Sequence, residues 1–138
     1  MNLIRKTYDT TEVQITSFQS TKGITEYHIF FQQTNCLEDF HNQLQHIQDV
    51  YARSVEELPG NPVAIFRRYF LSDVTNQTDE LMERERLSPY CALSIVQQAP
   101  MNGTKIALWA WLQTGVQTQV LSNGLFEARH GAYGQLLG

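Results

Sequence analysis

Two adjacent arginines, Arg67 and Arg68, stand inside an apolar, aromatic-rich stretch, "VAIFRRYFLSD" (63–73). The composition predicts a central β-strand, in which neighbouring side chains point to opposite faces. At least one guanidinium must then leave the solvent, and an unpaired buried charge is costly. One interpretation is that this arginine binds an anion in a cleft. The other is that the arginine lies at an edge-like position or forms a structural salt bridge, within or between chains. The candidate acids within the chain are Glu26, Asp73 and Glu127.

The other chemically capable side chains are scattered. Cys91 would need a neighbouring base or cation to act as a nucleophile, and packing explains it equally well. The hydroxyls of Tyr27, Tyr69 and Tyr90 could contact a ligand or belong to the core. His130, with Glu127 and Tyr133, is either a small acid–base cluster or part of a loop. No spacing of histidine or cysteine matches a metal site, so we expect neither metal nor cofactor.

The bulk properties narrow the class of protein. The 138 residues suit one domain, 42% are hydrophobic and only 17% are charged, so a partner is expected to cover part of the surface. The net charge of −4 argues against a nucleic-acid-binding protein. No signal-peptide core and no apolar run of about 18 residues is present, so we expect a cytoplasmic protein without a membrane segment.

Periodicity predicts an α+β fold with the order β-β-α-β-α-β-β and two helices on one face of the sheet. Asn35 is the expected cap of the first helix, and the charged run 79–86 predicts a solvated face on the second. Asn102-Gly103 predicts a type I′ hairpin between the last two strands. The expected strands are 12–19, 24–33, 63–73, 91–98 and 104–112, and the expected helices are 35–54 and 76–87.

The strand 104–112 is apolar on both of its faces. Ile106, Leu108, Ala110 and Leu112 alternate with a second set, Lys105, Ala107, Trp109 and Trp111. Two helices can cover only one face, so the tryptophan face is expected to meet other copies of the chain in a closed cyclic assembly. Residues 113–138 are interpreted as a C-terminal extension, with a further hairpin formed by 117–122 and 125–130.

Two stretches, "FRRYFLSDVTNQTDEL" (66–81) and "PYCALSIVQQAPMNGTKIALWAWL" (89–112), resemble the RidA/YjgF family of reactive-intermediate deaminases, also labelled L-PSP endoribonucleases or translation inhibitors. The resemblance covers roughly residues 10–112, so the chain divides into a RidA-like domain, 1–112, and the extension, 113–138. It implies a chorismate-mutase-like fold, a homotrimer, and clefts between subunits that bind small carboxylates or carbonyl compounds.

The family's active-site residues do not carry over. The family arginine that holds the substrate carboxylate falls on Cys91, the glutamate of the last strand falls on Trp109, and the serine-glycine pair falls near Phe31-Gln32. A thiol cannot replace the guanidinium fork, and an indole cannot position a water as a carboxylate does. The residues predicted to bind a ligand are therefore Arg67, Arg68, Tyr90, Cys91 and Trp109.

Three functions remain open at this point. The first is an oligomeric RidA-like domain that binds a small anionic or carbonyl ligand without deaminase activity. The second is an imine or enamine deaminase with a rearranged site, and the third is the N-terminal module of a larger, chorismatase-like enzyme. The sequence does not choose a substrate for any of them.

Overall fold

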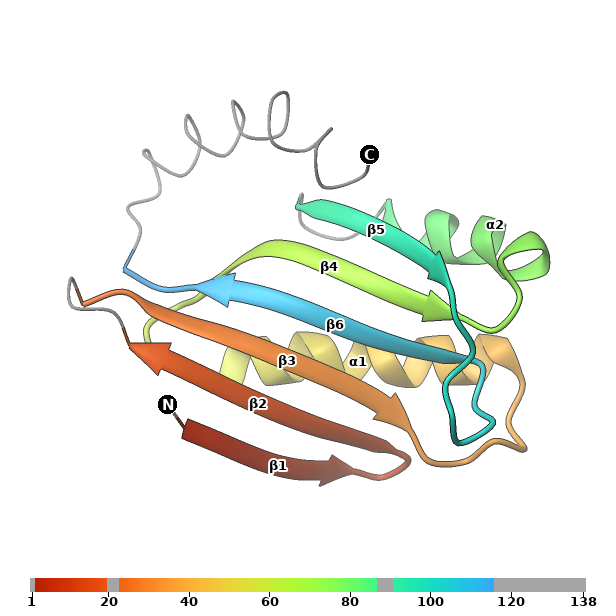
Figure 1. Ribbon diagram of the computed structural model, residues 1–138, viewed down its shortest axis with the longest axis horizontal. Helices are drawn as coiled ribbons and strands as arrows, with labels where there is room; N and C mark the ends of the chain where they lie inside the picture. The colour runs from red at the N-terminus through yellow and green to blue at the C-terminus, as the bar shows by residue number, and fades with distance from the viewer. Residues whose placement is uncertain (1, 20–22, 87–90, 116–138) are drawn as a thin grey trace.

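The computed structural model describes residues 2–19, 23–86 and 91–115. A six-stranded mixed sheet in the order β1-β2-β3-β6-β4-β5 carries both helices on one face (Figure 1). The predicted α+β class and the single helical layer are thereby confirmed. The elements are β1 (Asn2–Tyr8), β2 (Thr11–Gln19), β3 (Thr25–Gln33), α1 (Phe40–Glu57), β4 (Val63–Leu71), α2 (Val74–Glu85), β5 (Ala92–Gln97) and β6 (Ile106–Gln113).

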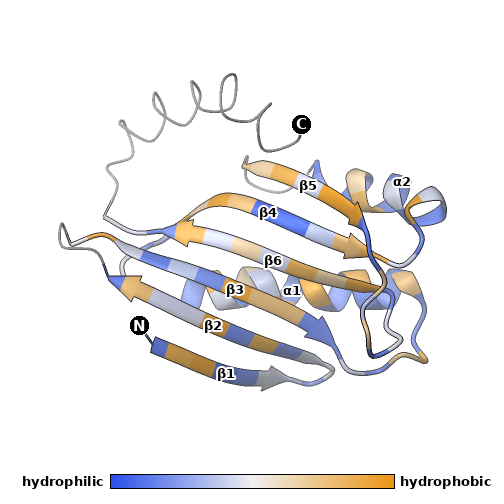
Figure 2. Ribbon diagram, in the orientation of Figure 1, coloured by the Kyte–Doolittle hydropathy of each residue, from blue (hydrophilic) through white to orange (hydrophobic). Residues whose placement is uncertain are grey.

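The core lies between the sheet and the two helices. The inward side chains of β6 are fully buried there, against Leu44 and Ile47 of α1 and Leu81 of α2. β6 is hydrophobic along most of its length, whereas β4 has a hydrophilic interruption at its middle (Figure 2). The opposite face of the sheet, which no described helix covers, is called the open face below.

The predicted hairpin between the last two strands is wrong. β4 lies between them, paired in parallel with β5 and antiparallel with β6. β4, α2 and β5 thus form a β-α-β unit, in which a helix connects two parallel neighbours. β6, apolar on both faces, takes a central position between β3 and β4, and the shorter β5 becomes an edge.

The Asn102-Gly103 connection is also not a type I′ turn. Among its residues only Gly103 has a positive φ, of 83°, and its amide donates to the Pro100 carbonyl at 3.2 Å. The Asn102 side chain instead accepts from the Thr104 amide at 3.1 Å and donates to the Gln33 carbonyl at 2.8 Å. Asn102 therefore anchors the β5–β6 connection to β3.

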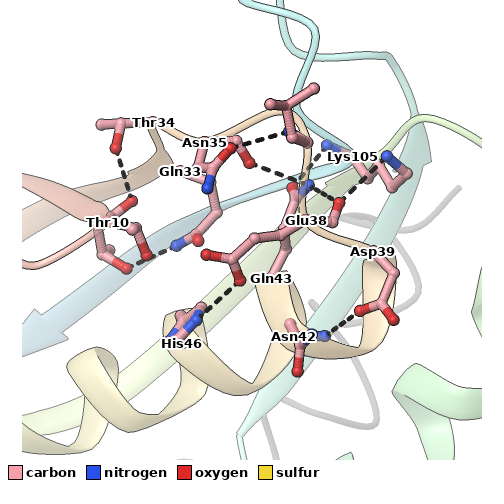
Figure 3. A network of polar contacts seen from close by, with 12 residues as sticks. Thr10, Gln33, Thr34, Asn35, Glu38, Asp39, Asn42, Gln43, His46 and Lys105 are labelled. Atoms are coloured by element: carbon pink, nitrogen blue, oxygen red, sulfur yellow. Dashed lines mark hydrogen bonds and ion pairs between the residues drawn. The ribbon is translucent and has the colours of Figure 1, made fainter.

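The first helix begins later than predicted. Asp39, not Asn35, is the N-cap of α1 and accepts from the Asn42 amide at 2.9 Å. Asn35 closes a turn before it by accepting from the Leu37 amide. The buried Gln43 donates to the Glu38 carbonyl and accepts from the Lys105 amide, so one side chain joins the start of α1 to the residue that precedes β6 (Figure 3).

β1 was not predicted. Nearly all of its residues are exposed, because it forms the edge of the sheet, and its alternation gives only a weak signal. The expected hairpin of 117–122 and 125–130 lies outside the described residues. Within the described part of the chain, neither helix is both long and apolar enough to cross a membrane.

Candidate functional site

β4 sends its two arginines to opposite faces, as its period of two requires. Arg67 is 3% exposed and points to the helices. There it makes a two-pronged ion pair with Glu85 at the end of α2, with its Nη2 and Nη1 at 2.6 and 3.2 Å from the carboxylate oxygens. Glu85 was expected on a solvated helix face, and none of the acids considered from the sequence is the partner.

Polar groups from three further positions complete this buried cluster. The Tyr69 hydroxyl donates to Glu85 at 2.6 Å, and the Gln48 amide donates to it at 3.3 Å. Arg67 Nε donates to the Cys91 Sγ at 3.1 Å. Its guanidinium carbon lies 5.2 Å from the centre of the Tyr51 ring. Among the described residues, Glu85, Cys91 and Tyr51 of the same chain thus surround the Arg67 guanidinium.

Burial governs the ionisation of this cluster. It raises the pKa of Tyr69 well above its ordinary value, and the Glu85 carboxylate adds to the rise. Burial also raises the pKa of Tyr51 to about 12. For Arg67 burial opposes the charge, but Cys91 and Glu85 outweigh it, so the pKa of Arg67 is raised. The cluster holds a fixed ion pair with neutral phenols around it.

Arg68 lies on the open face in a different environment. Its side chain is half-buried, its guanidinium carbon is 5.3 Å from the centre of the Phe66 ring, and its Nε is 3.4 Å from the Ser94 hydroxyl. Among the described residues, no carboxylate lies within ion-pair distance of it. Arg68 is therefore a half-buried cation that lacks an acidic partner in this part of the chain.

Aromatic side chains surround Arg68 on the open face. Trp109 of β6 lies directly opposite it in the strand register, and the Trp109 ring is 5.6 Å from that of Phe66. The His28 ring stacks beside Trp109 and Trp111, at centroid distances of 5.7 and 6.1 Å. We define the aromatic surface as Phe18, His28, Phe30, Phe66, Phe70, Trp109 and Trp111.

An acid also lies on this face, and it is already engaged. Glu26 of β3 accepts from the Trp111 indole at 2.9 Å and from the Gln113 amide at 3.3 Å. Next to the aromatic surface, Glu26 is thus hydrogen-bonded within the chain, whereas Arg68 has no carboxylate partner among the described residues. Such an arrangement can hold an anion at Arg68 and apolar groups around it.

The predicted ligand-binding residues divide between the two faces. Arg68 and Trp109 come together on the open face, whereas Arg67 and Cys91 come together under the helices. Tyr90 lies outside the described residues. Glu85 was missed, although its position four residues after the buried Leu81 places it on the inward side of α2. No group of three metal-ligating side chains occurs within the described ranges.

No protein-family model matches the chain, and no curated protein matches it. Its fold is similar to a crystal structure of a "putative translation initiation inhibitor" from Salmonella typhimurium, with a TM-score of 0.53 and 15% identity. The similarity covers 83% of this chain and 97% of the other. At this identity it establishes the fold alone. The chain has the chorismate-mutase-like α+β fold, and the resemblance to the RidA/YjgF family is supported at that level.

Proposed function

We propose that copies of this chain associate through the aromatic surface as a homotrimer, and that the interface binds a small anionic or carbonyl ligand through Arg68. The observation that carries the proposal is the half-buried guanidinium of Arg68, which has no carboxylate partner in the described part of the chain. In a covered interface that charge needs an anion.

The association itself is favoured by the chemistry of the open face. Six aromatic rings on four adjacent strands, all of the aromatic surface except the buried Phe66, stay partly exposed and would form a large aromatic patch for a monomer. Burial of such a patch between copies is the usual outcome, and closed cyclic symmetry leaves no copy exposed. The resemblance to the RidA/YjgF family favours three copies.

The ligand is proposed to be bound and not deaminated. Cys91, at the position of the family's carboxylate-binding arginine, contacts Arg67 under the helices. Trp109, at the position of the family's glutamate, supplies no carboxylate on the open face. Cys91 and Trp109 therefore favour a site that binds its ligand but does not deaminate it.

Light scattering tests the assembly. The natural chain is expected to show about three times its 15.9 kDa mass. Trp111→Glu places a charge in the aromatic surface and beside Glu26, and it is expected to yield monomers. Met82→Glu is the matched control, because Met82 is exposed on α2, away from the open face. A monodisperse monomer for the natural chain would overturn the proposed assembly.

Thermal unfolding with and without pyruvate, a small carboxylate that also carries a carbonyl, tests the ligand site. Pyruvate is expected to raise the melting temperature of the natural chain and of Arg86→Ala, whose arginine lies exposed at the end of α2. It should have no effect on Arg68→Ala. An equal shift in Arg68→Ala would show that Arg68 does not hold the anion.

Two alternatives have distinct outcomes. Hydrolysis of 2-aminoacrylate-type imines that disappears in Arg68→Ala would favour a deaminase with a rearranged site. In a larger chorismatase-like enzyme, a second module of the same fold would cover the aromatic surface in place of a second copy. A chain that is monomeric alone and binds such a module would favour that arrangement.

A further inference from the structure

The open face has a hollow lined by Phe70, two residues along β4 from Arg68, and a small keto acid held at Arg68 would leave this hollow empty. Its volume is about 280 Å³, and its apolar lining includes Phe30, Phe70, Ala107 and Met101. Phe70 follows Arg68 by two residues on the same face of β4, a spacing of roughly 7 Å along the strand. The cation and the apolar hollow are therefore neighbours on one surface.

We infer that the ligand of this face is an amphipathic carboxylate, with its carboxylate on Arg68 and an alkyl or aryl group in the hollow. This inference rests on the proposed function and narrows its ligand class. A two- or three-carbon acid would occupy only the guanidinium end. A longer apolar group would also remove the walls of the hollow from water, which is favourable in proportion to the area covered.

The lining also sets a limit on the length of the ligand. A second hollow, of about 360 Å³, meets the first at Phe30 and Gln32 and continues over β2 and β1. Its lining changes to polar and charged groups, among them Arg5, Glu12 and Gln14. An alkyl chain that extends past Phe30 would enter this polar part, so the gain in affinity should stop there.

A homologous series of carboxylates tests the inference directly. Acetate, butyrate, hexanoate, octanoate and decanoate are titrated into the full chain by calorimetry, below the concentrations at which they form micelles. Affinity is expected to rise by about fourfold per added methylene and then to level off. Phenylacetate should bind more tightly than acetate.

Variants that fill the hollow identify the site. In Ala107→Leu the affinity should no longer rise with the length of the carboxylate, while acetate should bind as it does to the natural chain. Ala52→Leu, at an exposed position of α1, is the control and should behave like the natural chain. Ala107 is only 3% exposed, so Ala99→Phe, at the exposed rim of the same hollow, provides a second test that does not depend on the core. Arg68→Ala should lose the whole series, acetate included.

The outcomes separate this inference from the proposed function. If acetate binds through Arg68 but affinity does not change with chain length, the inference is wrong and the proposed function stands. If a gain with length survives in the folded variants that fill the hollow, the apolar group lies elsewhere and the inference is again wrong. If no carboxylate binds the natural chain, both are overturned.

Discussion

Arg67 and Arg68 are chemically identical neighbours on β4 with opposite environments. Arg67 enters the layer between sheet and helices, where Glu85 neutralises it and Tyr51 and Cys91 enclose it. Arg68 enters the open face, where aromatic rings and the Ser94 hydroxyl surround it. Within the described part of the chain the difference between them is the presence of an acid, which pairs Arg67 and leaves Arg68 as the candidate for ligand binding.

The comparison also explains why only the arginine under the helices has an acidic partner among the described residues. α2 supplies the carboxylate for Arg67 at its last turn, and α1 supplies Gln48 and Tyr51 to the same cluster. The open face has no described helix to supply an equivalent group to Arg68. Among the described residues Arg68 has no carboxylate partner, and this difference from Arg67 is the basis of the proposed function.

The largest effect should come from removing the arginine under the helices. Arg67→Ala leaves the Glu85 carboxylate, whose side chain is 4% exposed, without its counter-charge. We expect the free energy of unfolding to fall by about 3–5 kcal/mol, measured by urea denaturation. Arg68→Ala is the matched control and should cost less than about 1 kcal/mol. Equal losses in the two variants would contradict the distinction between the faces.

Removing both charges should be less harmful than removing one. Arg67→Met combined with Glu85→Leu replaces the ion pair by apolar groups of similar size, so no buried charge remains unpaired. The double variant should recover most of the free energy of unfolding that Arg67→Ala loses. Adding Tyr69→Phe to the double variant also removes the Tyr69 hydroxyl, which would otherwise be left without its acceptor. A double variant no more stable than Arg67→Ala would show that packing, and not charge, dominates the cluster.

The hydroxyl of Tyr69 should have a smaller effect. Tyr69→Phe removes a donor to the Glu85 carboxylate while keeping the ring, which is fully buried. The expected loss is about 1.5–3 kcal/mol, typical of hydrogen bonds to charged groups. Tyr27→Phe is the control, because the Tyr27 hydroxyl donates to a neutral carbonyl at 3.4 Å. Similar losses for both tyrosines would argue against a charge-assisted bond at Glu85.

Alkaline pH should lower the free energy of unfolding through the buried tyrosines between the sheet and the helices. A phenol whose folded pKa is raised stays protonated in the folded state while the unfolded state, with a pKa near 10, releases its proton. The stability due to Tyr51, whose folded pKa is about 12, is complete below pH 10 and is lost between pH 10 and 12. The slope should be about 1.4 kcal/mol per pH unit for each such tyrosine.

Urea denaturation at pH 9, 10 and 11 measures this slope. In Tyr51→Phe the part of the pH-dependent loss that is due to Tyr51 should be absent. The free energy of unfolding of this variant should therefore fall less than that of the natural chain as the pH rises. Tyr69, with its pKa raised further, should behave in the same sense in Tyr69→Phe. Curves that run parallel for the natural chain and both variants would show that these phenols do not carry the effect.

The sequence predicted the opposite directions of the two arginines but not the partner of either. Alternation along β4 follows from local geometry, so it can be read from a single strand. The pairing with Glu85 depends on how α2 lies across the sheet, which is a tertiary property. The four-residue spacing from Leu81 to Glu85 was a usable signal, but the surrounding exposed charges, such as Glu83, concealed it.

The strand order was predictable only in part. The composition of 63–73 correctly indicated an interior strand, β4, and the alternation within β6 correctly indicated a tryptophan-bearing face opposite the core. Asn102-Gly103 wrongly indicated a hairpin, because a turn signal describes four residues and cannot tell which strand lies between two others. Parallel pairing of β4 with β5 is set by the crossover through α2, a contact distant in sequence.

The smallest effect is expected from Glu26, the acid of the open face that accepts from the Trp111 indole. Glu26→Gln keeps a carbonyl oxygen that can accept from the Trp111 indole, so the free energy of unfolding should change by less than about 1 kcal/mol.

Removal of the negative charge of Glu26 should also strengthen carboxylate binding at Arg68. The gain should be no more than about threefold, because Glu26 and Arg68 lie on strands separated by β6 and water screens their charges. Titration of acetate into Glu26→Gln and into Glu83→Gln, which removes an exposed charge from α2, measures the change. Weaker binding in Glu26→Gln would mean that Glu26 supports the ligand instead of repelling it, and the open face would then hold a cationic or zwitterionic group as well as an anion.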